Sequence, residues 1–193
     1  LASQRYVRPG FAYGHWANGR NGCAITGNGD KNWVDYEVAF DFKMLPANRE
    51  FFHAYIPGET RGMTVIFRTK NGSESWNQPS THYNFGLNPK GGWGVSVVKD
   101  YQMPGYGFCP PEKRKGKYEK LAEGVASDYK DTGEGRFRIR VRANTFTVWF
   151  NDEKLVEHTH KSGEIDPIPY GGFGVQWRYE SMGWISNVEV KKL

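Results

Sequence analysis

Apolar and polar residues alternate with a period of two along most of this chain, and that period predicts β-strands. The clearest example is GRFRIRVRANTFTVWF, residues 135–150, in which three apolar residues alternate with arginines. The Ala-Asn pair that follows predicts a turn, and a second alternating run predicts a partner strand. The segment therefore predicts a β-hairpin.

The segment STHYNFGLNPKGGWGVSVVKD, residues 80–100, alternates in the same way on both sides of a turn that contains proline and glycine. Its apolar side holds Tyr83, Phe85, Leu87, Val95 and Val97, and its other side holds His82, Asn84, Ser96 and Val98. Further strands are predicted at residues 36–43, 62–69, 171–178 and 184–193. No stretch has clear helical periodicity, although residues 112–130 could hold one or two helical turns.

The composition agrees with a protein built from strands and turns. The chain has 193 residues with 24 glycines and 10 prolines, and 16% of its residues are aromatic, which is typical of all-β proteins. We expect a single domain, residues 1–193, folded as an all-β antiparallel β-sandwich, with a long loop excursion at about 101–117 that is rich in glycine, proline and basic residues. No apolar run approaches the ~20 residues that a membrane span needs.

The charge allows an acidic partner without requiring one. The formal net charge of +5 fits ordinary solubility, or contact with an anionic polysaccharide. No aromatic RNA-binding strand motif and no Cys/His finger is present, so we expect no nucleic-acid partner. The arginines at 136, 138, 140 and 142 predict either a solvated strand face with acidic neighbours or a contact for an anionic glycan. Cys23 and Cys109 belong to no C-x-x-C pair and could form one disulfide or be two buried thiols.

Catalytic chemistry has little support in the sequence. Glycoside hydrolysis needs two facing carboxyl groups, whereas Glu37 and Asp41 lie ~13 Å apart along one strand. His158 and His160 share one side of a strand and could bind a metal, but no third ligand is identifiable, so we predict no metal site. No nucleophile elbow or phosphate loop occurs. We assign no catalytic residue.

Several segments resemble concanavalin A-like jelly-roll domains. AITGNGDKNWVDYEVAFDFKM resembles their early strand pair, GMTVIFR and HYNFGL resemble strands that follow, and GGFGVQWRYESMGWISNVEVKKL resembles their closing pair. The glutamine and the final NVEVKKL are similar to the 3-keto-disaccharide hydrolase-like branch, while the middle strands equally resemble laminin G-like domains and carbohydrate-binding modules. The resemblance implies a jelly-roll β-sandwich, a fold that hosts lectins, binding modules, glycanases and lyases.

Two departures from that pattern bear on cofactors and catalysis. Many relatives have an Asp before the Asn of the last strand, often near a structural calcium, whereas this chain has Ser186-Asn187. We expect no cofactor, and a structural calcium ion, although compatible with the fold, has no support at Ser186-Asn187. The E-x-D-x-x-E motif of the laminarinase-type glucanases is also absent, because the spacing of Glu37 and Asp41 differs from it.

The resemblance implies that one sheet is concave and could bind a sugar. Flat aromatic rings hold the C–H faces of sugars, and amide, guanidinium and imidazole groups bind the hydroxyls. The predicted ligand-binding residues are Arg68, His82, Asn84, Gln176 and Arg178 on the concave side, with Trp76, Trp93 and Tyr106 near strand ends as walls. The alternative is a scatter of polar exterior residues and core rings, because an error of one residue in register reverses every assignment.

We therefore hypothesise recognition of a polysaccharide or oligosaccharide, including anionic ones, by a secreted or cell-envelope protein. The chain would be in mature or trimmed form, because its first residues lack the apolar core of a signal peptide. The sequence favours a binding module over an enzyme. The alternatives are a glycan-cleaving enzyme (a glycoside hydrolase, a lyase or a 3-keto-glycoside hydrolase-like protein) and a structural or adhesive module without a small ligand.

Overall fold

The computed structural model of the chain describes residues 13–16, 25–26, 32–45, 62–69, 79–88, 90–102, 114–129, 133–178 and 182–193; at 13–16, 25–26, 44–45, 176–178 and 182–184 it describes the backbone alone. These residues form strands and no helix. The strands are β1 (Tyr13–Trp16), β2 (Ile25–Thr26), β3 (Tyr36–Leu45), β4 (Gly62–Thr69), β5 (Ser80–Leu87), β6 (Gly92–Gln102), β7 (Lys115–Val125), β8 (Glu134–Arg142), β9 (Thr145–Phe150), β10 (Glu153–Thr159), β11 (Gly172–Arg178) and β12 (Met182–Lys192).

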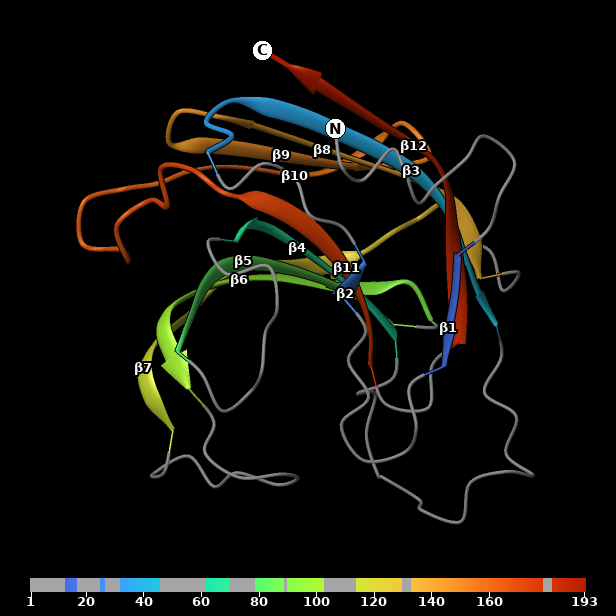
Figure 1. Cartoon of the computed structure of the whole chain (residues 1–193), viewed down its shortest axis with the longest axis horizontal. Coiled ribbons are helices and arrows are strands. Elements are labelled where there is room, and N and C mark those ends of the chain that lie inside the picture. The colour runs from blue at the N-terminus through green and yellow to red at the C-terminus, as the bar shows by residue number, and fades with distance from the viewer. Residues whose placement is uncertain are drawn as a thin grey trace.

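The strands form two antiparallel sheets that lie face to face (Figure 1). The first, which we call the back sheet, has the order β1-β12-β3-β8-β9-β10. The second, the front sheet, has the order β2-β11-β4-β5-β6-β7, and Figure 1 shows that it curves with its hollow side turned away from the back sheet. The prediction of an all-β antiparallel β-sandwich is confirmed. The limits of a single domain at residues 1–193 stay a prediction.

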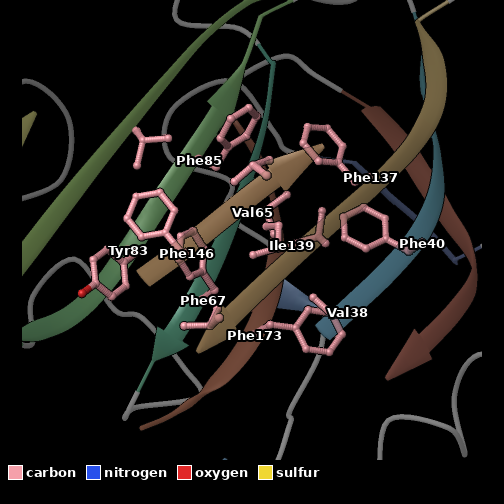
Figure 2. Packing of buried hydrophobic residues seen from close by; sticks show 14 of the residues in the cluster. Val38, Phe40, Val65, Phe67, Tyr83, Phe85, Phe137, Ile139, Phe146 and Phe173 are labelled. Atoms are coloured by element: carbon pink, nitrogen blue, oxygen red, sulfur yellow. The ribbon is translucent and has the colours of Figure 1, made fainter. Parts of the chain in front are cut away.

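Aromatic and aliphatic side chains fill the space between the sheets (Figure 2). The ring centroids of Phe85 and Phe137, from opposite sheets, are 5.1 Å apart, and those of Phe67 and Phe146 are 5.4 Å apart. All four side chains are at most 1% exposed, and burying a side chain of this size stabilises the fold by roughly 1.5–3 kcal/mol. The apolar sides predicted for segments 80–100 and 135–150 both face this core, because side chains alternate between the two faces of a strand.

The predicted hairpin at 135–150 is strands β8 and β9. Arg142 pairs with Thr145, so the Ala-Asn turn between them has two residues, as predicted. The next turn has Asn151 at φ 45° and Asp152 at φ 67°. Two consecutive positive φ angles are those of a type I′ turn, which favours Asn and Asp and matches the twist of the flanking strands.

Residues 112–130 do not form helical turns where the structure describes them. Residues 115–125 are strand β7, which pairs along β6, and β6 itself extends to Gln102. The prediction of a helical turn is therefore wrong, and the loop excursion at about 101–117 is shorter at both ends. The hydrogen bonds that β6 offers to a neighbouring strand outweigh the weak local preference of a segment rich in lysine and glycine. Residues 103–113 lie outside the described residues.

The last strand, β12, contains a β-bulge. Ser186 pairs with Asp41, whereas Glu189 pairs with Ala39, so β12 bulges between them. Asn187 lies in the bulge with φ 49°, a conformation that asparagine tolerates better than most residues, and its Nδ2 donates to Asp41 Oδ2 at 2.6 Å. No helix long and apolar enough to cross a membrane occurs in the part of the chain that the structure describes.

Candidate functional site

The hollow side of the front sheet is defined by positions that the strand register aligns across it. Paired residues on neighbouring antiparallel strands lie on the same side of a sheet, and the side changes at each step along a strand. The register gives three rows of paired positions, which together we call the concave face. The rows are Gln176–Thr64–Gly86–Gly94–Glu123, Gly174–Ile66–Asn84–Ser96–Lys120 and His82–Val98–Tyr118.

His82 and Asn84 both lie on the concave face, on the side of β5 opposite Tyr83 and Phe85. Their accessibility differs. His82 is 4% exposed, whereas Asn84 is partly exposed. The neighbouring residues of the concave face are buried, since Ile66, Ser96 and Val98 are at most 8% exposed. Asn84 is therefore the better placed of the two to contact a ligand.

Arg68 does not face the concave side, and that prediction is wrong. A β-bulge interrupts the pairing of β4 with β11 at this position, and Arg68 has φ 52°. The bulge turns the side chain inward, where it is 1% exposed. Its guanidinium donates from Nη1 to Ile168 O and from Nη2 to Val34 O, both at 2.5 Å. Simple alternation from Ile66 would have placed Arg68 outside.

The buried guanidinium is held by its surroundings. The Arg68 Nη2 also lies 3.4 Å from Asp35 Oδ1. The backbone N–H of Arg68 donates to the Tyr36 hydroxyl at 3.0 Å, and that hydroxyl donates to Gly172 O at 3.2 Å. Burial lowers the pKa of Arg68, and the nearby Tyr36, Tyr83 and Asp35 oppose that shift. Arg68 therefore links β4 to two other segments of the chain and has a structural role.

Trp93 also lies inside the sandwich, contrary to the prediction that it walls the site. It shares the side of β6 that carries Val95 and Val97, and its ring stacks on Phe85 with 5.8 Å between centroids and 18° between planes. The indole lies so close to Gly124 that a β-carbon there would be 2.6 Å from it. Trp93 therefore belongs to the end of the core.

Of the remaining predicted residues, the structure describes the backbone of two and leaves two undescribed. Gln176 pairs with Thr64 and Arg178 pairs with Gly62, so both backbone positions lie on strand β11 of the front sheet. Trp76 and Tyr106 lie outside the described residues, as do Cys23 and Cys109. The ligand-binding roles of these residues stay predictions.

The structure adds an aromatic pair that sequence reasoning missed. Tyr118 of β7 is 59% exposed, and its ring lies 6.1 Å from that of Tyr101, at the end of β6. Lys120, two residues further along β7, is ion-paired with Glu123. The alternation in KYEK could have revealed β7, because it places Tyr118 and Lys120 on the side opposite Glu119.

The carboxylates are not arranged for glycoside cleavage in the described part of the concave face. Glu123 is the acidic residue in the three rows, and it lies on the edge strand. Glu37 and Asp41 lie on the outer side of the back sheet, where Arg140 and Arg136 bind them at 2.7 and 2.9 Å. Facing carboxyl groups ~5–10 Å apart would be needed for either common route of hydrolysis.

The arginine stripe of β8 is balanced by acidic neighbours. Arg136 also binds Glu189 at 2.8 Å, and these contacts, first the hydrogen bond to Asp41, raise its pKa. The guanidinium of Arg138 lies 4.2 Å from the centroid of Trp149. This arrangement agrees with a solvated strand face, and it leaves the back sheet less suited to an anionic glycan.

Comparison with known proteins identifies the family. Residues 12–191 match the model of the 3-keto-alpha-glucoside-1,2-lyase-like domain. The chain belongs to this family. The match spans almost the whole chain and confirms one branch of the predicted resemblance. A comparison with curated protein sequences gives no match.

Solved structures show the same fold in carbohydrate-binding proteins. The carbohydrate binding module CBM66 from Bacillus subtilis is 12% identical, with a TM-score of 0.56 and coverage of 94% of both chains. The legume lectin-like domain from Entamoeba histolytica is 15% identical, with a TM-score of 0.53 and coverage of 94% of this chain and 84% of that one. The exoplasmic/lumenal domain of VIP36, in its Ca²⁺/Man3GlcNAc-bound form, is 12% identical, with a TM-score of 0.54 and coverage of 92% and 76%. The concanavalin A-like jelly-roll fold is confirmed.

Proposed function

We propose that this family member recognises a polysaccharide or oligosaccharide through its concave face. The observation that carries the proposal is the group of accessible side chains on strands β5 to β7: Asn84, Tyr118 and Lys120. The neighbours support it, since one is a carbohydrate binding module and another is a glycan-bound domain. The lumenal or exoplasmic origin of the latter also supports an extracytoplasmic location.

Each side chain has a distinct part in this proposal. The exposed ring of Tyr118 would stack on the C–H face of a sugar. The amide of Asn84 would both donate to and accept from sugar hydroxyls, and Lys120 would donate or would attract an acidic sugar. Asn84 and Lys120 are paired through Ser96 and lie two strands apart, ~10 Å. A sugar between them would therefore rest on the small side chain of Ser96.

Glycan cleavage is the second candidate, and the family match favours it. Elimination beside a carbonyl needs a base that removes a proton. In the described rows, the imidazole is that of His82, which is 4% exposed, and the carboxylate is that of Glu123, which is ion-paired with Lys120 at the edge. Binding without turnover is therefore the better supported function.

A glycan array followed by product analysis tests both candidates. We expect the purified protein to bind at least one class of glycan and to leave it intact. Tyr118→Ala should weaken binding to that glycan about tenfold, the effect of losing ~1.4 kcal/mol of stacking. Tyr170→Ala removes a 40%-exposed tyrosine outside the three rows and should bind as the wild type does.

The other outcomes are decisive as well. Release of sugar products would establish the cleaving enzyme. Wild-type affinity in both Tyr118→Ala and Asn84→Ala would refute the concave face as the binding surface. A properly folded protein that binds no glycan would support a structural or adhesive module.

A further inference from the structure

Two histidines and a glutamate meet beyond the end of strand β10, away from the concave face. His158 pairs with Phe146, so its side chain lies on the inner side of β10, and its ring stacks on Phe146 at 5.3 Å. His160 lies two residues on, and its ring packs edge-on against that of His158 at 5.2 Å. A turn in which the Glu164 N–H donates to Lys161 O brings the Glu164 carboxylate back to both rings.

We propose that His158, His160 and Glu164 bind a divalent transition-metal ion of the zinc type. This site is independent of the proposed glycan-binding function. The sequence predicted no metal here because the histidine pair had no identifiable third ligand. The fold supplies Glu164 from the segment that follows β10, so the prediction of no metal is replaced by this proposal.

The distances suit a small tetrahedral ion. Glu164 Oε2 lies 3.0 Å from His158 Nε2 and 3.5 Å from His160 Nδ1, and one ligand atom from each residue lies within 4.8 Å of the others. Ligands ~2.0–2.1 Å from a tetrahedral zinc ion are ~3.3 Å from one another. Two nitrogens and one carboxylate oxygen form a donor set that zinc, cobalt and nickel prefer over calcium or magnesium.

A buried nitrogen also points to a ligand. His160 Nδ1 is inaccessible to solvent and makes no hydrogen bond of good geometry, with Glu164 Oε2 at 3.5 Å, and the His160 side chain is only 3% exposed. Buried polar atoms are rarely left unsatisfied. A metal ion between Glu164 and His158 would accept the lone pair of His160 Nδ1, so that this buried nitrogen would no longer be unsatisfied.

Outer contacts orient the ligands as they do in metal sites. His160 Nε2 lies 2.6 Å from the hydroxyl oxygen of Tyr83, which accepts a hydrogen bond from Ile168 N–H at 3.1 Å. A metal-bound His160 would donate its Nε2–H to Tyr83, which leaves Nδ1 free for the ion. Tyr83 is fixed in the core beside Phe146 (Figure 2), and Lys161 N–H donates to Glu164 Oε2 at 3.1 Å.

The site is accessible from one side. The His158 and Glu164 side chains are 13% and 20% exposed, in contrast to His160 at 3%. Metal sites with three protein ligands keep a fourth position for water or another small ligand. That position would face solvent beside Glu164, and the bound ion would tie β10 to the segment that leads into β11.

Titration of the metal-free full chain with zinc chloride tests the proposal. Calorimetry should show one zinc ion per chain, and zinc should raise the melting temperature. His158→Gln and Glu164→Gln should each weaken zinc binding at least tenfold. Glu157→Gln is the matched control, because Glu157 lies on the opposite side of β10 and contacts Lys154 and Thr147. Its affinity for zinc should equal that of the wild type.

Cobalt spectroscopy keeps the proposal testable if a variant fails to fold. Wild-type protein with cobalt chloride should show visible bands of a low-coordinate nitrogen and oxygen site, without a thiolate charge-transfer band. A thiolate band would assign the ion to Cys23 or Cys109 instead. The proposal is overturned by that result, by no zinc binding in the wild type, or by unchanged affinity in folded His158→Gln and Glu164→Gln.

Discussion

At the scale of single residues, Arg68 and Tyr36 show how a polar group can be buried in an aromatic core. Tyr36 is fully buried, and its hydroxyl satisfies both the Arg68 N–H and the Gly172 carbonyl. The hydroxyl thereby supports the bulge that turns Arg68 inward. Loss of that one oxygen atom would remove a hydrogen-bond partner from each of two backbone groups, and an unsatisfied buried group costs about 1–3 kcal/mol.

Tyr36→Phe should therefore lower the free energy of unfolding at neutral pH, and its effect should depend on pH. Burial raises the pKa of Tyr36 above its ordinary value of 10.0. The unfolded state then loses this proton first as pH rises, so the stabilisation by Tyr36 is complete below about pH 10 and declines above it. The difference in free energy of unfolding between wild type and Tyr36→Phe should be constant below about pH 10 and narrow as the pH rises above it.

Urea unfolding at a series of pH values measures this difference. Tyr118→Phe is the control, because it removes a hydroxyl from a 59%-exposed ring and should change the free energy little at neutral pH. A Tyr36→Phe protein as stable as the wild type at neutral pH would contradict the structural role of the hydroxyl.

At the scale of elements, strand β7 depends on the bulge that it forms with β6. The register shifts between Lys99 and Gln102, and Gly116 lies opposite the shift with φ 82°. A β-carbon at Gly116 would lie 2.2 Å from the carbonyl oxygen of Asp100. Glycine is therefore required there both by the left-handed backbone and by the close approach of β6.

Gly116→Ala should destabilise the fold more than a comparable change elsewhere. Gly163 has φ 96°, but a β-carbon there would meet nothing within 4 Å, so Gly163→Ala isolates the cost of the backbone conformation, ~1 kcal/mol. The further loss in Gly116→Ala measures the collision with Asp100. Chemical unfolding of both variants gives the comparison, and equal losses would show that β6 moves aside without cost.

At the scale of the whole molecule, the two outer faces differ in how their charges are compensated. On the back sheet, Arg136 and Arg140 are bound by acidic partners. On the front sheet, β7 carries Lys115, Lys117 and Lys120 against Glu119 and Glu123, so three positive and two negative charges leave the strand with a net charge of +1, although Lys120 is ion-paired with Glu123. An anionic glycan would therefore meet a more favourable potential at β7 than at β8.

Binding of an anionic glycan should weaken as the salt concentration rises, because salt screens exposed charges. Lys117→Gln combined with Lys120→Gln should reduce both the affinity and its salt dependence. Arg140→Gln together with Arg138→Gln removes the same charge from the opposite face and should leave both unchanged. Affinities measured over a series of salt concentrations show which sheet binds the anionic glycan. Equal effects of the two double variants would refute a site on the front sheet.

The sequence predicted the fold well because alternation is a local property that burial preserves. Phe85 and Phe137 could be assigned to the core from their own strands. Arg68 could not, because a bulge set by pairing with a distant strand reversed its side. Glu164 could not be matched to His158 for a similar reason, since only the fold of the intervening turn brings them together.

The position of β7 at the edge of the front sheet also affects how the protein behaves at high concentration. An outer strand offers unpaired backbone groups to which another molecule could add a strand. β7 carries lysines along its length, and its pairing with β6 is broken by bulges at two places. Like charges would repel a second copy, and the bulges interrupt the flat edge that it would need. The strand on which we propose that Tyr118 contacts a glycan is thus also protected against aggregation.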